Sequence, residues 1–227
     1  MQRAMLLLIM LATMLGMKAQ TDDEYLMEVG GGLGIMGYLG DYNNMLTRDL
    51  QPMMTVFVRR NLNAYMALRL DTSIGTLKGS ERDGRTVYPS SSASPYHFSN
   101  KLTDVSLMYE YNFWPYGTGK DYYGAKRLTP FLFVGVGGTY ASGDGTNIFT
   151  ANIPIGIGLK YKIGTRVNAG IAWAMHFAMS DKLDGRKDPY GITSSGIFKN
   201  KDCYSALQLT LSYSFMPKCT TCNKDIK

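Results

Sequence analysis

The sequence predicts an all-β protein, an eight-stranded antiparallel transmembrane β-barrel whose lumen is filled by side chains. Three observations support this prediction. An apolar N-terminal stretch has the form of an export signal. Eight later segments alternate between apolar and polar or small residues. The connections between these segments alternate between short turns and long polar loops, as outer-membrane barrels require.

The export signal occupies residues 1–19. Arg3 is followed by an uncharged apolar run over residues 4–15, and the small residues Gly16 and Ala19 precede a polar stretch that begins at Gln20. This run is shorter than the roughly 20 residues that span a bilayer as a helix. We therefore expect residues 1–19 to be a cleaved signal peptide, residues 20–216 to form the barrel, and residues 217–227 to be a tail.

The alternation has a period of two residues. Val56 and Val58, for example, lie on one face of a strand whose other face carries Thr55 and Arg59. Most segments exceed the roughly 9–11 residues that a tilted strand needs to cross a membrane. They cover residues 24–40, 53–60, 65–76, 102–113, 128–140, 149–163, 166–179 and 204–215.

The polar face of these strands is predicted to point into the lumen. It is rich in Gly and Ser with scattered charges, which would make a poor apolar core but fits inside a narrow eight-stranded barrel. Buried charges need partners, so we expect a structural ion-pair network. Its predicted cations are Arg59, Arg69, Lys160 and Lys162, and its predicted acids are Glu28, Asp71, Asp104 and Glu110.

The connections predict the orientation. Residues 61–64 form a short turn, and Gly164-Thr165 is predicted to be a two-residue type II′ hairpin. Residues 77–101 and 180–202 read as long external loops, which places both termini in the periplasm. Residues 114–127 break this pattern, because they form a long, aromatic and basic connection on the short-turn side. Such a surplus loop is a candidate for function.

Catalytic, metal and cofactor sites are not expected. The arrangement of His176 with Ser180 and Asp181 is the one candidate for a nucleophilic, lipid-modifying site, and closeness in sequence does not bring such groups together. Cys219 and Cys222 lack the fold that a redox CxxC motif needs, so a structural or intermolecular disulfide is expected. The formal charge of +6 is modest and no basic run is interleaved with aromatics, so nucleic acid is not an expected partner.

The opening strand resembles that of PorG, an outer-membrane protein of the type IX secretion system of Bacteroidetes. The similarity lies in the Y-x-G-D-x-N turn, carried by Tyr38, Gly40, Asp41 and Asn43. Residues 52–79 are similar to an R-x-N-x-N-x-x-x-A-x-R stretch of that family, although Arg59 stands where the family has Tyr. Residues 102–114 and the segment LTPFLFVGVGG at 128–138 extend the resemblance over most of the chain.

The resemblance implies a non-enzymatic role at the outer membrane, in which the barrel anchors or assembles a periplasmic ring of PorK-like and PorN-like proteins. Outer-membrane lipids are further expected partners, and the tail cysteines offer an intermolecular disulfide. The alternative is a structural or surface-interaction barrel like OmpA and OmpX, and a lipid-A-modifying enzyme is a weaker one. The predicted partner-binding residues of the periplasmic turn and tail are Trp114, Tyr116, Lys120, Tyr122, Tyr123, Lys126, Arg127, Lys218, Cys219 and Cys222.

Overall fold

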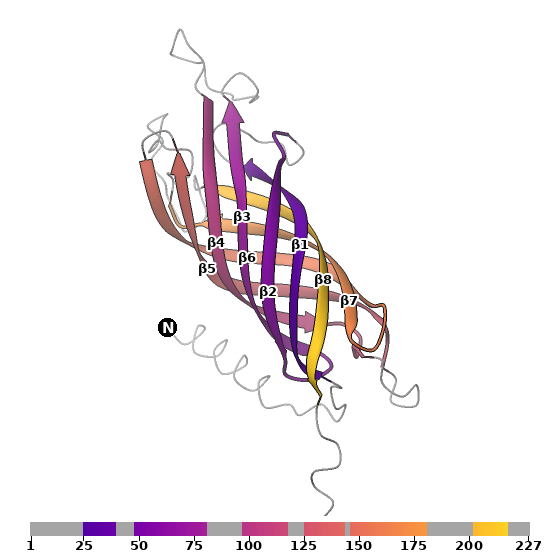
Figure 1. Ribbon diagram of the computed structural model, residues 1–227. Helices are drawn as coiled ribbons and strands as arrows, with labels where there is room; N and C mark the ends of the chain where they lie inside the picture. Colours follow the sequence, from indigo (N-terminus) through magenta and orange to yellow (C-terminus); the bar gives the residue numbers. More distant parts are fainter. Residues whose placement is uncertain are drawn as a thin grey trace, which may run out of the picture.

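The computed structural model describes residues 25–39, 48–80, 97–117, 125–143, 146–180 and 202–217. These residues form eight antiparallel strands that close into a single barrel in the order β1 to β8, as predicted (Figure 1). The strands are β1 (Tyr25–Leu39), β2 (Gln51–Asn61), β3 (Met66–Ser80), β4 (His97–Asn112), β5 (Leu128–Gly143), β6 (Thr146–Lys162), β7 (Val167–Ala178) and β8 (Cys203–Pro217). No helix within the described ranges is long and apolar enough to cross a membrane.

The pairing of the strands is staggered, so the strands are inclined to the barrel axis. Starting at Met27 and moving to the paired residue of each next strand leads back to β1 at Gly37, ten residues further along; the path runs through Arg60, Leu68, Tyr109, Val134, Ile155, Met175 and Ser205. Such a stagger belongs to a closed barrel whose strands are inclined to its axis, and with eight strands the interior is just wide enough for side chains to fill.

The barrel has two unlike ends. At the turn end, residues 62–65, 113–127 and 163–166 join successive strands, and β1 begins where β8 finishes. The opposite end, called the loop end, carries the connections over residues 40–50, 81–96, 144–145 and 179–202. Strands β3 to β6 extend further at the loop end than their neighbours (Figure 1).

Two predicted connections were wrong. The expected loop at residues 77–101 is partly strand, because β3 and β4 stay paired from Leu77↔Asn100 to Ser80↔His97. In this region the outward residues are polar, but the two strands remain paired through their backbones. The alternation of apolar residues therefore identifies only part of each strand. The predicted two-residue hairpin is a three-residue turn, since Ile163 N donates to Val167 O and the φ of Gly164 lies outside the left-handed region. The turn between β2 and β3 has the same hydrogen bonds, from Leu62 N and Asn63 N to Met66 O.

The two faces of the wall are inverted relative to those of a soluble protein, as predicted. Outward side chains are apolar and exposed, with Val56 62%, Val136 65% and Leu209 63% accessible. Every charged residue of the predicted network is buried in the interior. Exposed aromatic side chains gather near the turn end, at Tyr111, Phe113, Trp114, Tyr161 and Tyr213. An apolar outer band bordered by aromatic residues around a polar interior is the distribution of a barrel that spans a lipid bilayer.

Candidate functional site

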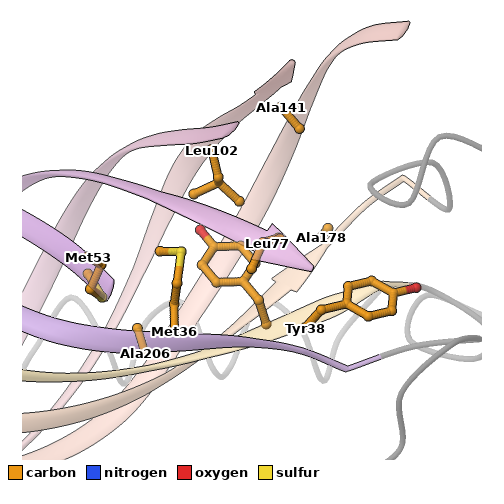
Figure 2. Packing of buried hydrophobic residues seen from close by; sticks show 9 residues of the cluster. Met36, Tyr38, Met53, Leu77, Leu102, Ala141, Ala178 and Ala206 are labelled. Carbon is orange, nitrogen blue, oxygen red and sulfur yellow. The ribbon is translucent and has the colours of Figure 1, made fainter. Parts of the chain in front are cut away.

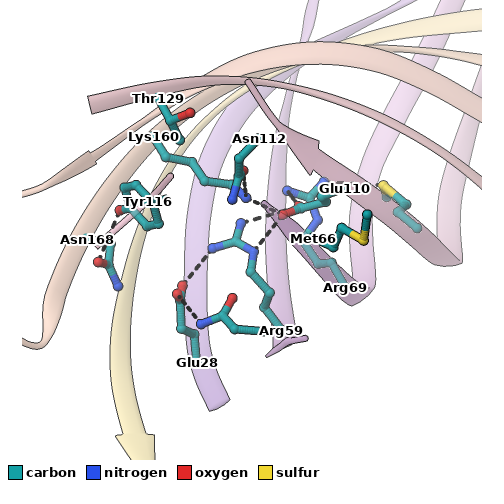
Figure 3. Close-up of polar contacts among 12 residues, drawn as sticks. Glu28, Arg59, Met66, Arg69, Glu110, Asn112, Tyr116, Thr129, Lys160 and Asn168 are labelled. Carbon is teal, nitrogen blue, oxygen red and sulfur yellow. Dashed lines mark hydrogen bonds and ion pairs between the residues drawn. The ribbon is translucent and has the colours of Figure 1, made fainter. Parts of the chain in front are cut away.

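The centre of the lumen holds an ion-pair cluster in which Glu110 is the hub. Its carboxylate lies 2.9 Å from Arg59 Nε, 3.2 Å from Arg69 Nη1 and 2.5 Å from Lys160 Nζ (Figure 3). Arg59 also pairs with Glu28 at 2.6 Å. Each charged side chain of the cluster comes from a different strand, namely β1, β2, β3, β4 or β6. The cluster therefore ties distant parts of the wall together through groups that would be costly to leave unpaired.

Aromatic rings line the same level of the lumen. The guanidinium of Arg69 lies 5.5 Å from the ring centroid of Phe57 and 5.3 Å from that of Phe133, and Lys160 Nζ lies 4.3 Å from the ring of Phe131. Ring faces attract cations when water is excluded. The rings also fill the space left by inward glycines, since a Cβ at Gly156 would collide with Phe133. The lumen is thus packed with side chains at its centre.

A second polar group lies between this cluster and the loop end. Asp104 accepts hydrogen bonds from Ser106 at 2.5 Å, from Thr139 at 2.9 Å and from Asn152. Asp71 accepts one from Thr55 at 2.8 Å and lies 3.5 Å from Arg69 Nε. Of the predicted acids, Asp104 is therefore held mainly by neutral donors, while Glu28, Asp71 and Glu110 have cationic partners.

His176 belongs to this buried group and is not at an external rim. Its ring stacks on Tyr204 with centroids 4.4 Å apart, its Nδ1 lies 3.0 Å from the Tyr204 hydroxyl, and Asp104 is 3.9 Å away. Its side chain is 4% exposed. The proposed partners of a catalytic site were Ser180, at the end of the described segment, and Asp181, which lies outside the described residues. The contacts of His176 are therefore with Tyr204 on β8 and Asp104 on β4.

An apolar cluster closes the lumen toward the loop end (Figure 2). Leu77, Leu102 and Tyr204 are fully buried in it, and the Tyr38 hydroxyl donates to Asp202 at 2.5 Å. The cluster consists of Met36, Tyr38, Met53, Leu77, Leu102, Ala141, Ala178, Tyr204 and Ala206. The alternation pattern did not reveal it, because Met36 and Tyr38 follow inward positions from Glu28 to Gly34 that are polar or glycine.

Tyr116 closes the turn end. It comes from the long connection between β4 and β5, and its ring enters the lumen, where only 8% of the residue is exposed. Its backbone N donates to Ala64 O at 3.0 Å, and its hydroxyl donates to Asn168 on β7 at 3.1 Å (Figure 3). Burial, with the nearby Glu28 carboxylate, raises the pKa of the Tyr116 phenol. Tyr116 was expected to contact a partner, but the structure places it inside the mouth.

Lys162 lies beside Tyr116 and joins no acid of the predicted network. Its Nζ is 5.4 Å from the Tyr116 ring and 5.8 Å from the Tyr25 ring, and the residue is 4% exposed. It borders a small polar cavity with Glu28, Asn61 and Asn112. The two described cavities of the lumen have room for about one water each. Neither is a binding pocket for an organic ligand.

Three described residues at the two ends of the long connection are accessible. Trp114 is 40% exposed, Lys126 Nζ lies 4.7 Å from its ring, and Arg127 is exposed. The base of the connection is closed by hydrogen bonds from Lys126 N to Pro115 O at 2.7 Å and from Gly117 N to Lys126 O at 3.2 Å. The other predicted contact residues, Lys120, Tyr122, Tyr123, Lys218, Cys219 and Cys222, lie outside the described residues.

The position of Cys203 limits the disulfides. Cys203 begins β8 at the loop end, where it donates to Leu39 O at 3.3 Å, and β8 finishes at Pro217 at the turn end. A strand of 15 residues spans roughly 50 Å. Cys219 and Cys222 follow Pro217 by too few residues to return that distance, because an extended chain covers at most about 3.5 Å per residue. Cys203 therefore cannot pair with either tail cysteine of its own chain.

The solved structure of one similar protein, at a TM-score above 0.5, agrees with this fold. The crystal structure of Neisserial surface protein A (NspA) has a TM-score of 0.51 and 13% identity, covering 83% of this chain and 97% of that one. Ail of Yersinia pestis in complex with the heparin analogue sucrose octasulfate has a TM-score of 0.48 and 11% identity, with coverages of 85% and 99%. The N-terminal β-barrel domain of Pseudomonas aeruginosa OprF has a TM-score of 0.44 and 13% identity, with coverages of 84% and 98%.

No curated protein sequence matches the chain significantly. The family model described as "Domain of unknown function (DUF6089)" matches residues 2–224. This match spans almost the whole sequence and includes all eight strands. The chain therefore belongs to the DUF6089 family, and in this member the family's fold is a closed eight-stranded β-barrel.

Proposed function

We propose that this chain is a non-enzymatic barrel of the bacterial outer membrane that acts by binding at its ends, as a structural or surface-interaction barrel. The observation that carries the proposal is the sealed lumen. Tyr116 occupies the turn end, the Glu110 cluster fills the centre, and the apolar cluster around Leu102 closes the loop end. An interior of this kind conducts no solute, so interactions must take place at the rims and loops.

Localisation and surface exposure test this proposal. An epitope inserted in residues 81–96 should be accessible to antibody on intact cells, and the protein should fractionate with the outer membrane. An epitope added after Lys227 should become accessible only when the outer membrane is permeabilised. Reconstituted protein should show no stepwise conductance in planar bilayers. Recovery in a soluble fraction, or pore-like conductance, would overturn the proposal.

A second candidate function is the anchoring of a periplasmic secretion ring of PorK-like and PorN-like proteins. It rests on the resemblance to PorG, and none of the matches reported above is to a secretion protein. The structural observation that favours it is the accessible turn-end surface, where Lys126 lies over the Trp114 ring and the next residue, Arg127, is exposed. Aromatic and arginine side chains are enriched in protein interfaces.

Crosslinking of envelopes followed by affinity purification tests this second candidate. The native chain should enrich ring proteins, and a Trp114→Ala/Lys126→Ala variant should lose them together with secretion of proteins that carry a C-terminal signal. A Lys78→Ala variant, altered at the opposite end, is the matched control. If the native chain enriches no ring protein, or if the control loses binding equally, this function is excluded.

The tail cysteines could also attach the barrel to a periplasmic partner through a disulfide. Because Cys203 cannot reach them within the chain, Cys219 and Cys222 can bond to each other or to a partner. Non-reducing gels of native envelopes should show a high-mass band that disappears in a Cys219→Ser/Cys222→Ser variant and persists in Cys203→Ser. A band that depends on Cys203, or no band, would count against a tail disulfide with a partner.

A further inference from the structure

The charges of the barrel wall are segregated by sign. All four carboxylates of the eight described strands, Glu28, Asp71, Asp104 and Glu110, point into the lumen and are buried. The exposed charged residues of these strands are Arg60, Lys78 and Lys101. The outer surface of the strands therefore presents only positive charge, and it does so at the borders of the apolar band.

Two of these cations are neighbours at the loop-end border. Lys78 on β3 pairs in register with Ser99 on β4, and Lys101 pairs with Thr76, so the two lysines are diagonal neighbours on the outer face. Diagonal positions across antiparallel strands lie about 7–8 Å apart, within reach of one shared anion for long side chains. Below them on the same face, Ile74 and Val105 are 59% and 47% exposed and belong to the apolar band.

Aromatic residues continue this border on the next two strands. Thr103, two residues after Lys101, pairs with Tyr140 on β5, and Tyr140 pairs with Phe149 on β6. Phe149 is 75% exposed, and a Cβ at the outward Gly138 would meet its ring at 2.9 Å, so the ring extends over Gly138 on the outer wall. Two lysines and two rings thus form one strip across β3 to β6, which we call the loop-end strip.

We propose that the loop-end strip binds the phosphorylated headgroup of an outer-leaflet glycolipid of the lipid A type. Lys78 and Lys101 contact a phosphate, and Tyr140 and Phe149 pack against the sugar ring and the first carbons of the acyl chains. Ammonium groups bind phosphate as strong charge-assisted donors, and aromatic residues favour the interface of a membrane. The apolar wall below the strip is in position to contact the acyl chains.

The choice of a glycolipid follows from where the strip lies. It is at the loop end, which faces outward in the proposed function on which this inference rests. The bound group must carry a phosphate at the level of the border, an apolar part below it and a face that can lie on aromatic rings. A phosphorylated sugar with acyl chains meets all three requirements, whereas a free phosphate meets only the first.

Lipid titration of the purified full-length mature protein in detergent tests the inference. The probes are diphosphoryl lipid A, its dephosphorylated form and phosphatidylglycerol. The native protein should bind diphosphoryl lipid A most tightly, and a Lys78→Gln/Lys101→Gln variant should bind it on the order of tenfold more weakly, as expected for two lysines near a lipid phosphate. Both side chains are exposed, so circular dichroism should show the variant to be folded.

Arg60→Gln, at the opposite border, is the matched control and should keep native affinity. Unchanged binding by the double lysine variant would overturn the inference, as would an equal loss in Arg60→Gln, which would indicate unspecific attraction. Equal, lysine-dependent binding of phosphatidylglycerol would overturn the assignment to a glycolipid. Failure of the proposed function would appear in surface labelling and conductance, whereas failure of this site would appear only in the titration.

Discussion

The hydroxyl of Tyr116 donates a hydrogen bond to the side-chain oxygen of Asn168 at 3.1 Å, across the turn-end mouth of the barrel. Asn168 in turn donates to Ser212 at 3.3 Å, and Ser212 donates to Glu28 at 3.1 Å. The long connection between β4 and β5 is therefore fixed to the far wall and to the margin of the ion-pair cluster. Its exposed part can serve as a contact surface because its buried part holds it in place.

Removing this hydrogen bond should loosen the turn end. Tyr116→Phe keeps the ring and loses the bond to Asn168, so we expect a loss of about 1 kcal/mol in the free energy of unfolding. Tyr116→Ala also empties the mouth and should cost about 3 kcal/mol. Urea unfolding in detergent, followed by tryptophan fluorescence, measures both. Tyr161→Phe, whose ring faces outward, is the control, and an equal loss there would contradict the role of Tyr116.

The buried phenol also predicts a dependence on pH. Because burial raises the pKa of Tyr116 in the folded state, that state retains the proton when the unfolded chain has lost it. The contribution of Tyr116 to stability should therefore be constant below about pH 10 and fall above it. Urea midpoints at about pH 8 and about pH 11 should show a larger loss in the native protein than in Tyr116→Phe. Identical losses would show that Tyr116 is not the group responsible.

Neutralising the hub of the ion-pair cluster should be strongly destabilising. Glu110→Gln preserves shape but leaves Arg59, Arg69 and Lys160 without their shared carboxylate, at an expected cost of about 3–5 kcal/mol. Asp71→Asn is the matched control, because its single ion pair with Arg69 is longer, at 3.5 Å. Chemical unfolding of both variants gives the comparison. If Asp71→Asn costs as much as Glu110→Gln, the hub role of Glu110 is wrong.

Inward glycines should tolerate no side chain where an aromatic ring fills their space. A Cβ at Gly156 would collide with the ring of Phe133 and with the backbone oxygen of Trp173, so Gly156→Ala should cost about 1–3 kcal/mol. Gly31 faces outward and its nearest obstacle, Thr55 O, is 3.3 Å away. Gly31→Ala should be closer to neutral. Thermal unfolding of the two variants distinguishes them, and the reverse order would refute this account of the packing.

The apolar cluster that closes the lumen toward the loop end should contribute to stability as a closely packed core does. Leu102→Ala removes a fully buried side chain and should destabilise by about 2–5 kcal/mol. Leu107, on the same strand, faces outward and is 49% exposed. In a bilayer its replacement by Ala should cost much less, because lipid fills the space. Comparable losses from the two substitutions would show that the cluster is not closely packed.

The strand pattern was readable because a membrane imposes one rule on the whole outer surface. Along β2, Val56 and Val58 face lipid and are exposed, so Thr55 and Arg59 face the lumen and are buried. The rule ends where the wall leaves the bilayer. The polar extensions of β3 and β4 around Lys78 and Lys101 therefore lack the apolar alternation and resemble loops in the sequence.

The acids and cations of the lumen were identifiable, whereas their partners were not. The tertiary register alone gives Glu110 three cations and leaves Lys162 beside two tyrosine rings. The sequence does not indicate that the aromatic residues Tyr38, Tyr204 and Phe133 point inward and pack in the lumen. They become closures and packing elements only because the stagger of the barrel brings residues from distant strands to one level.

The sequence by itself determined that the chain forms a barrel with an apolar exterior and a charged interior, because a two-residue period is a local property of each strand. The tertiary structure decided that the lumen is sealed at both ends and that Tyr116 is buried. These facts depend on register and on distances between strands, and no local pattern encodes either.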